Sequence, residues 1–288
     1  MEYFEFDNKV KIPMLGLGTF PLTGDVLETT IKNAVGLGYE LIDTAVGYKN
    51  EENIGTMVRA GSINPDKVFI TSKINQSTLT GRRRYLYINR KTIKRAYKDS
   101  CKNLNIKKLN AYLIHMPFNG CSKHYIDMMR LFDEGMVDVI GVSNFDIREL
   151  KELHKKCGRW PMMNQTEISP FNTQTDLIQF CQENGILVQA YSPFGRGNLV
   201  QEILSNPTLI SVADNHNKTV GQVVLRFIVQ QGVAVVARST NNDRLKSNID
   251  IFDFTLSENE MALISQLNRN VVFGANQVHK YDKDPIVI

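Results

Sequence analysis

The chain has 288 residues, of which 42% are hydrophobic and 22% are charged, and its formal net charge at pH 7 is +4. These values are typical of a globular protein with a substantial core, and they argue against a disordered chain. No apolar run reaches the roughly 18 residues of a membrane-spanning helix, so the sequence predicts no membrane association.

The N-terminus and the cysteines favour a cytoplasmic protein. Residues Met1 to Glu5 have neither the basic start nor the apolar stretch of a signal peptide. The four cysteines lack the spacing of metal or redox sites, so we expect reduced thiols and no metal. The basic run Arg82 to Arg84 is short and isolated, and we interpret it as a solvated loop rather than a nucleic-acid site. The cysteines are Cys101, Cys121, Cys157 and Cys181.

An N-terminal hairpin precedes three short strands that end on chemically capable side chains. Phe4 to Phe6 and Val10 to Ile12 flank a polar turn and predict the hairpin. The three later strands end on an acid, an amine and an imidazole in turn. They are Glu40 to Ile42 before Asp43, Val68 to Ser72 before Lys73, and Ala111 to Ile114 before His115.

Strand ends of this kind meet at one place in a parallel barrel. The carboxyl ends of the strands form the face on which such barrels build active sites. Taken singly, an acid at a strand end is more often a helix cap, a lysine a solvated edge, and a histidine a buried structural group. Their order along the chain, with Tyr48 on the loop behind Asp43, favours a shared site instead.

Along the whole chain, the segments between the short strands have apolar residues at the spacing of a helix. Such alternation argues for a parallel sheet with crossover helices, and no linker, repeat or low-complexity tract divides the chain. We therefore predict one (β/α)8 barrel, a TIM barrel, as a single domain over residues 1–288. The predicted helices are Val26 to Leu37, Arg90 to Leu104, Tyr125 to Phe132, Ile147 to His154, Thr175 to Glu183 and Val220 to Gln230.

Five motifs, spread in a fixed order over nearly the whole chain, resemble the aldo-keto reductase family. The resemblance implies a (β/α)8 barrel whose N-terminal hairpin closes the bottom. It also implies NADPH-dependent reduction of aldehydes and ketones. The motifs are Gly38 to Gly55, Gly141 to Phe145, Asn164 to Pro170, Ala190 to Gly195, and Val235 to Ser239 with Arg244 and Asn248.

The resemblance implies that Tyr48 is the proton donor and that His115 orients the substrate carbonyl. Lys73 would tune Tyr48, and Asp43 would keep Lys73 protonated. An unperturbed tyrosine has a pKa of about 10. A unit charge about 4 Å away, at an effective dielectric of about 20, is worth roughly 4 kcal/mol. The sequence therefore predicts that Lys73 lowers the pKa of Tyr48 by about three pH units.

Cofactor contacts are implied by the same resemblance. A carboxamide-binding set would hold the nicotinamide, and Tyr191 would stack on its ring. The alternative for Ser143-Asn144 is a cap for the helix from Ile147. Arg238 and Arg244 would hold the phosphate that distinguishes NADPH from NADH, near a helix N-terminus. The implied cofactor residues are Thr19, Asp43, Ser143, Asn144, Gln165, Tyr191, Ser192, Arg238, Ser239, Asn241, Arg244 and Asn248.

The substrate pocket is where the chain departs from the family. Phe20, Asn75 and Met116 stand at positions where the family often has tryptophan, and they are expected to line the pocket. With short loops after His115 and Asn270, they predict a shallow, open site. The only tryptophan, Trp160, precedes the predicted sixth barrel strand and is expected at the opposite end of the barrel.

Two other functions compete with carbonyl reduction. One is a cofactor-binding regulatory barrel with little turnover, and the other is a Schiff-base aldolase that uses Lys73. The intact set of four catalytic positions argues against the first. Asp43 and Tyr48 beside Lys73, with the carboxamide-binding set, argue against the second. We expect a cytoplasmic monomer that acts on a small carbonyl compound and binds neither nucleic acid nor membrane.

Overall fold

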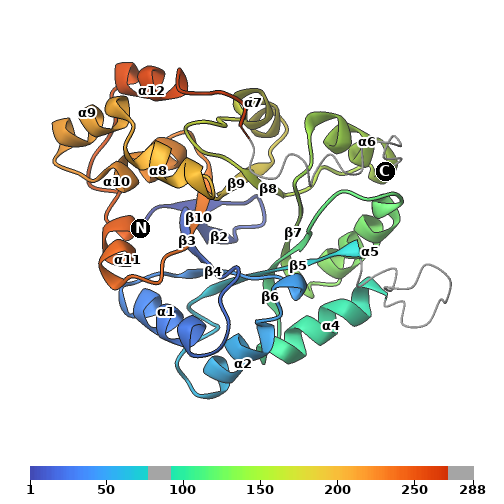
Figure 1. Ribbon diagram of the computed structural model, residues 1–288. Coiled ribbons are helices and arrows are strands. Elements are labelled where there is room, and N and C mark those ends of the chain that lie inside the picture. The colour runs from blue at the N-terminus through green and yellow to red at the C-terminus, as the bar shows by residue number, and fades with distance from the viewer. Residues whose placement is uncertain (77–91, 272–288) are drawn as a thin grey trace.

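The computed structural model of the protein describes residues 1–76 and 92–271, and its centre is a closed barrel of eight parallel strands (Figure 1). The chain order of the strands is also their order around the barrel. β10 closes the ring by pairing with β3, Val235 beside Leu15. The predicted (β/α)8 barrel is confirmed. The barrel strands are β3 (Leu15–Gly18), β4 (Leu41–Asp43), β5 (Phe69–Ile74), β6 (Leu109–Ile114), β7 (Val137–Ser143), β8 (Met163–Glu167), β9 (Leu187–Tyr191) and β10 (Ala234–Ala237).

The predicted N-terminal hairpin is present and lies at the amino ends of the barrel strands. β1 (Tyr3–Glu5) pairs antiparallel with β2 (Lys11–Pro13). At its tip, Asn8 Nδ2 donates to the carbonyl oxygen of Asp138, at the start of β7, over 2.8 Å. The Tyr3 hydroxyl donates to Glu40, just before β4, over 2.6 Å. These contacts place the hairpin across the bottom of the barrel, so the carboxyl ends of the strands stay open.

Helices surround the barrel, and all six predicted ones are present (Figure 1). The bounds of α7 are as predicted, and those of the other five are shifted. α5 begins four residues before the predicted start, and the first two residues of the predicted Arg90 to Leu104 helix lie outside the described residues. The basic run Arg82 to Arg84 also lies outside them. The helices are α1 (Gly24–Gly36), α2 (Glu51–Arg59), α4 (Ile93–Leu104), α5 (Cys121–Asp133), α6 (Ile147–Cys157), α7 (Thr175–Glu183), α10 (Val220–Val229) and α11 (Asn242–Ile249).

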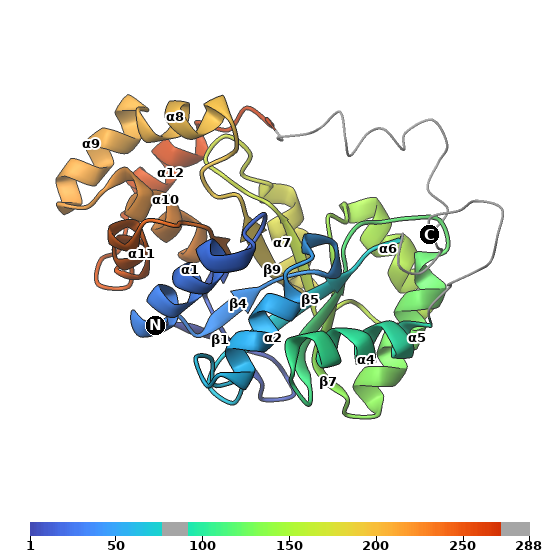
Figure 2. The same cartoon turned by 60° about the horizontal axis from the view of Figure 1, so that its bottom comes forward.

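Three further helices gather at one side of the ring (Figure 2). α8 (Asn198–Leu204) and α9 (Pro207–His216) follow β9, and α12 (Glu258–Ser265) packs against α9. His216 Nε2 of α9 lies 3.0 Å from the carboxylate of Glu260 of α12, at hydrogen-bond distance. α8 and α9 lengthen the connection between the seventh and eighth barrel strands, whereas α12 follows the eighth strand.

The only tryptophan lies at the bottom of the barrel, as predicted. Trp160 precedes β8 and therefore sits at its amino end. Its ring stacks on His154 of α6 with a centroid distance of 3.9 Å, and it meets Phe180 of α7 edge to face at 5.6 Å. Trp160 thus joins two outer helices at the face remote from the strand carboxyl ends.

Candidate active site

A buried ion pair forms the base of the site. Asp43 is the last residue of β4, and Lys73 lies near the end of the neighbouring strand β5. Lys73 Nζ lies 2.6 and 2.7 Å from the two carboxylate oxygens of Asp43, and it also donates to the carbonyl oxygen of Thr44 over 2.9 Å. The Lys73 side chain is 0% exposed. All three of its ammonium protons therefore have an acceptor.

Tyr48 lies directly beside this pair, on the short 3-10 helix η1 (Val46–Tyr48). Lys73 Nζ is 5.0 Å from the centroid of its ring. The imidazole of His115, which follows β6, meets the Tyr48 ring edge to face with a centroid distance of 5.6 Å. The structure thus brings together the four side chains that the sequence placed on four separate segments.

Asn50 anchors the loop that carries Tyr48. Its side chain is fully buried, and its Nδ2 donates to Thr19 Oγ1 over 3.1 Å and to the Leu22 carbonyl over 3.0 Å. Its Oδ1 accepts from the Thr44 hydroxyl over 2.5 Å. These contacts tie η1 to the ends of β3 and β4. This role of Asn50 could not be predicted from the sequence, because one asparagine before a helix usually signals only a cap.

The predicted direction of the Tyr48 pKa shift is wrong. Burial raises the pKa of Tyr48, and the charge of Lys73, which lowers it, does not fully offset that effect. The calculation from sequence counted the attraction of the ammonium for the phenolate and left out the loss of hydration. Tyr48 is therefore a protonated phenol at neutral pH.

Lys73 and His115 also hold fixed protonation states. Burial alone lowers the pKa of Lys73. Its electrostatic interactions and hydrogen bonds with Asp43 and Tyr48 outweigh this effect and raise the pKa above its ordinary value. Burial, and then the charge of Lys73, lower the pKa of His115 to about 3. At neutral pH the site therefore contains an ammonium ion, a neutral imidazole and a neutral phenol. The two proton donors beside the ion pair, Tyr48 and His115, are both uncharged.

The predicted carboxamide-binding residues lie together, at the ends of β7 and β9 and in the middle of β8. Asn144 has a left-handed backbone, with φ of +65°. Its Nδ2 donates to Ser143 Oγ over 3.0 Å, and its Oδ1 accepts from the Tyr191 hydroxyl over 2.6 Å. Gln165 Nε2 donates to Asp43 Oδ1 over 2.8 Å. The alternative role as a helix cap is excluded, because Asp146 caps α6 in a capping box.

These contacts fix the polarity of the carboxamide-binding residues. Because Ser143 Oγ accepts from Asn144, the Ser143 hydroxyl proton is available to a carbonyl oxygen. The Gln165 and Asn144 side-chain oxygens are available to an NH2 group. A primary amide presents one carbonyl oxygen and one NH2 group, and this is the chemistry that the set complements. The residues fit the nicotinamide carboxamide.

The predicted phosphate-binding residues surround the N-terminus of α11. Asn241 caps this helix by accepting from the Arg244 backbone N–H over 2.9 Å, and the Ser239 hydroxyl bonds to the Asn241 backbone. The Arg238 and Arg244 side chains are exposed, whereas Asn248 is buried. Two exposed guanidinium groups at a helix N-terminus are a suitable place for a phosphate dianion.

The three predicted substrate-pocket residues lie around Tyr48 and Asn144. Phe20 is 48% exposed, and the centroid of its ring lies 5.0 Å from that of Tyr48. Met116 Sδ accepts from Asn144 Nδ2 over 3.0 Å. A Cβ added to Gly47 would lie 3.1 Å from the Asn75 side-chain nitrogen, so Asn75 packs against η1. The loop between His115 and α5 is short, as predicted, while the residues after Val271 lie outside the described part.

Arg196 is a second residue whose role could not be predicted from the sequence. It follows β9, and its Nε donates to the Ser192 hydroxyl over 2.8 Å. Its guanidinium carbon lies 5.5 Å from the centroid of the Tyr191 ring, and its charge acts on both Tyr48 and Tyr191. A lone arginine in a glycine-containing loop has no signal in the sequence that would distinguish it from a solvated one.

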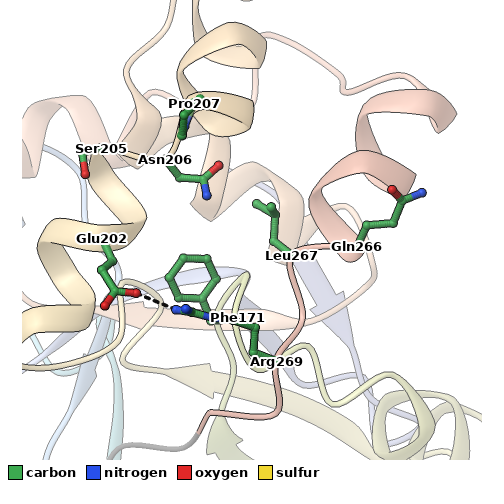
Figure 3. A pocket seen from close by; sticks show the side chains of 8 residues that line it. All are labelled: Phe171, Glu202, Ser205, Asn206, Pro207, Gln266, Leu267 and Arg269. Atoms are coloured by element: carbon green, nitrogen blue, oxygen red, sulfur yellow. Dashed lines mark hydrogen bonds and ion pairs between the residues drawn. The ribbon is translucent and has the colours of Figure 1, made fainter.

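A cavity of about 480 Å³ lies apart from these residues, between α8, the start of α9 and the segment after α12 (Figure 3). Arg269 covers the Phe171 ring at 3.9 Å and forms an ion pair of 2.6 Å with Glu202. The cavity shares no lining residue with the predicted site. Within residues 1–76 and 92–271, no cluster of side chains could hold a metal ion, no helix is long and apolar enough to cross a membrane, and all four cysteines are free.

Comparison with known proteins decides the family. The sequence profile of the Aldo/keto reductase family matches residues 14–269. The chain belongs to the aldo-keto reductase family. This aldo-keto reductase is 36% identical to the glyoxal reductase of Bacillus subtilis over 272 residues, which cover 93% of the chain and 94% of the relative. It is 31% identical to the methylglyoxal reductase DkgA of Escherichia coli, over 91% and 92% of the two chains.

Solved structures agree with this assignment. The aldo-keto reductase of Bombyx mori in complex with NADP superimposes with a TM-score of 0.86, at 29% sequence identity, covering 99% of this chain and 98% of that one. The aldo-keto reductase therefore has the fold of its family as well as its sequence motifs. It is an oxidoreductase that acts on carbonyl groups, with NADP(H) as its cofactor.

Proposed function

We propose that this aldo-keto reductase reduces small aldehydes and dicarbonyl compounds with NADPH, with Tyr48 as the proton donor. The observation that carries the proposal is the buried Lys73–Asp43 pair beside Tyr48, with His115 also in contact with the Tyr48 ring. The test is to follow NADPH absorbance after an aldehyde is added. Binding of NADPH without turnover would favour a regulatory barrel instead.

The protonation states of the site residues determine which group donates the proton. When bound, NADPH supplies a hydride to the carbonyl carbon. As negative charge develops on the carbonyl oxygen, Tyr48 donates its proton there, since an alkoxide is a far stronger base than a phenolate. Lys73 stabilises the phenolate that remains, and Asp43 holds Lys73 in place. A raised Tyr48 pKa is compatible with this role, because the donor must be protonated at the start.

Neutral His115 orients the carbonyl. An imidazole with its pKa lowered to about 3 is uncharged at neutral pH, so one ring nitrogen carries a proton and the other does not. The protonated nitrogen can donate to the substrate oxygen beside the Tyr48 hydroxyl. Two uncharged donors then converge on the atom that becomes negative, which is the arrangement that stabilises such a transition state.

The pH dependence of aldehyde reduction is expected to be flat between about pH 5 and pH 9, because neither His115 nor Tyr48 changes its protonation state in that range. His115 stays neutral because its pKa of about 3 lies below this range. Tyr48 stays protonated because burial raises its pKa above the ordinary value. Measuring kcat against pH with one aldehyde checks this. A loss of kcat as the pH is lowered through 6 to 7 would show that His115 becomes charged there, and it would contradict the assignment.

The substrate class is proposed from the pocket and from two relatives. Phe20 is half-exposed, and neither Asn75 nor Met116 provides a large aromatic wall. A methylene in a good hydrophobic pocket is worth about 1–3 kcal/mol of discrimination, and much of that is missing here. The names of the glyoxal and methylglyoxal reductases agree with small dicarbonyls. We expect broad use and weak apparent binding in a panel of aldehydes, ketones and keto sugars, and strong selectivity for a bulky ketone such as a steroid would contradict this.

Arg244→Ala is expected to weaken NADPH binding by roughly 1.5–3 kcal/mol, the worth of a charged hydrogen bond, and to leave NADH binding nearly unchanged. The reason is that the exposed Arg244 guanidinium stands at the N-terminus of α11, where we place the phosphate. Dissociation constants for both cofactors decide it. Arg59→Ala, at an exposed arginine on α2, is the matched control. Equal losses for NADPH and NADH would place Arg244 away from the phosphate.

We also propose that the protein works as a cytoplasmic monomer with one barrel domain over residues 1–288. The support is that one barrel supplies every residue of the proposed site. Light scattering during size-exclusion chromatography tests the oligomeric state, and a dimer at micromolar concentration would contradict it.

A further inference from the structure

A buried glutamine contacts the carboxamide-binding set from inside the barrel. Gln189 lies on β9 directly opposite Gln165 of β8, and neither side chain is exposed. Gln165 Nε2 donates to Gln189 Oε1 over 2.6 Å and to Asp43 Oδ1 over 2.8 Å. Gln165 therefore uses both protons of its amide nitrogen on acceptors inside the barrel.

These two contacts determine which end of the Gln165 amide faces the strand ends. Asp43 is a carboxylate that also binds Lys73, so it can only accept, and the atom that faces it must be the nitrogen. A single contact would leave the amide free to rotate about it. The second contact, to Gln189, sets the amide plane. Gln165 Oε1 is then the only part of the amide left for a ligand.

From this geometry we infer that Gln189 is a positioning residue, which keeps the Gln165 oxygen directed at the NH2 group of the nicotinamide carboxamide. The inference rests on the proposed function, in which Gln165 contacts the cofactor. A rotated Gln165 would place its own NH2 group against that of the cofactor, and two donors cannot form a hydrogen bond. Gln189 would therefore affect cofactor binding without touching the cofactor.

Gln189 uses only half of its amide for this task. Its Nε2 is buried and has no hydrogen-bond partner among the described residues. Only the oxygen is needed, so a glutamate in its place would keep the contact. A carboxyl group offers an acceptor oxygen in either protonation state. Methionine has nearly the same length and no amide, and it would remove the contact.

The test compares NADPH with its 3-acetylpyridine analogue, in which a methyl group replaces the carboxamide NH2. Titration calorimetry gives the dissociation constant of each for the parent, Gln189→Met and Gln189→Glu. The parent is expected to bind NADPH more tightly than the analogue. Gln189→Met is expected to reduce that ratio by about 3- to 10-fold, the worth of one neutral hydrogen bond. Gln189→Glu is expected to keep the parent ratio.

The ratio separates a positioning role from a structural one. If Gln189→Met weakened both cofactors equally, or neither, the inference would be overturned, as it would if Gln189→Glu behaved like Gln189→Met. Thermal unfolding shows whether each variant is folded, and Gln189→Leu replaces Gln189→Met if the latter is not. A parent that bound no NADPH would overturn the proposed function itself. If the parent reduced aldehydes and Gln189→Met kept the parent ratio of the two dissociation constants, this inference alone would be overturned.

Discussion

Replacing Tyr48 with phenylalanine is expected to lower kcat for aldehyde reduction by at least about 10²-fold, the contribution that general acid catalysis typically makes. The substitution removes the hydroxyl of the ring that lies beside both Lys73 and His115, and it leaves the ring in place. The edge-to-face contact with His115 and the contact with Phe20 therefore persist. Steady-state rates with a small aldehyde measure the effect.

Cofactor affinity is the first control for this variant. The NADPH dissociation constant is expected to change little, because the proposed cofactor contacts come from the ends of other strands. Tyr3→Phe is the matched substitution, since it also removes one hydroxyl, here at the bottom of the barrel against Glu40. Near-parental turnover in Tyr48→Phe would show that another group donates the proton.

Replacing Lys73 with methionine is expected to cost about 3–5 kcal/mol of unfolding free energy, as removal of one partner of a buried ion pair usually does. Asp43 would keep its buried charge and lose its cation, because Lys73 is the only ammonium or guanidinium group within 4.0 Å of it in the described part of the chain. The kcat should also fall by about 10²-fold or more, since a preorganised charge that stabilises the phenolate is lost. Urea unfolding and aldehyde turnover measure the two effects.

A double variant separates the loss of stability from the loss of activity. Lys73→Met with Asp43→Asn removes both charges, and such replacements are often neutral for stability. The asparagine oxygen also keeps an acceptor for Gln165 Nε2. We expect most of the lost stability to return while turnover stays low. Recovery of both would mean that Lys73 has only a structural role.

The barrel could be predicted from the sequence because its strands are short apolar runs between amphipathic helices. Two helices that were not predicted, α8 and α12, carry little of that signal. α8 and α12 each bury a single residue, Ile203 and Ile264, so neither shows a repeat of apolar positions. α5 was predicted too short because its first turn contains polar side chains that the structure buries, such as Ser122. Tertiary packing decides these cases.

The site was predictable to the level of which residues meet, and less so for their electrostatics. Asp43, Lys73 and His115 end neighbouring strands, and strand order alone brings them together. The Tyr48 pKa depends on how completely the phenol loses water, which is a property of the folded surroundings. Gln189 was overlooked because a polar residue inside a strand has no sequence signal for which atom its amide will meet. The roles of the site residues stay predictions until the variants are measured.

Trp160 determines what intrinsic fluorescence can report in this protein. It is the only tryptophan, and it is stacked on His154 at the amino end of β8. The five residues of β8, at roughly 3.3 Å each, separate it from the strand end where we place the nicotinamide. Its emission therefore reports on the packing of α6 against α7 and on unfolding at the amino ends of the barrel strands. Binding of NADPH should be followed by the signal of the reduced nicotinamide itself, because that ring absorbs tryptophan emission. A change in Trp160 emission on adding NADP+, which does not absorb that emission, would mean that the far end of the barrel had rearranged.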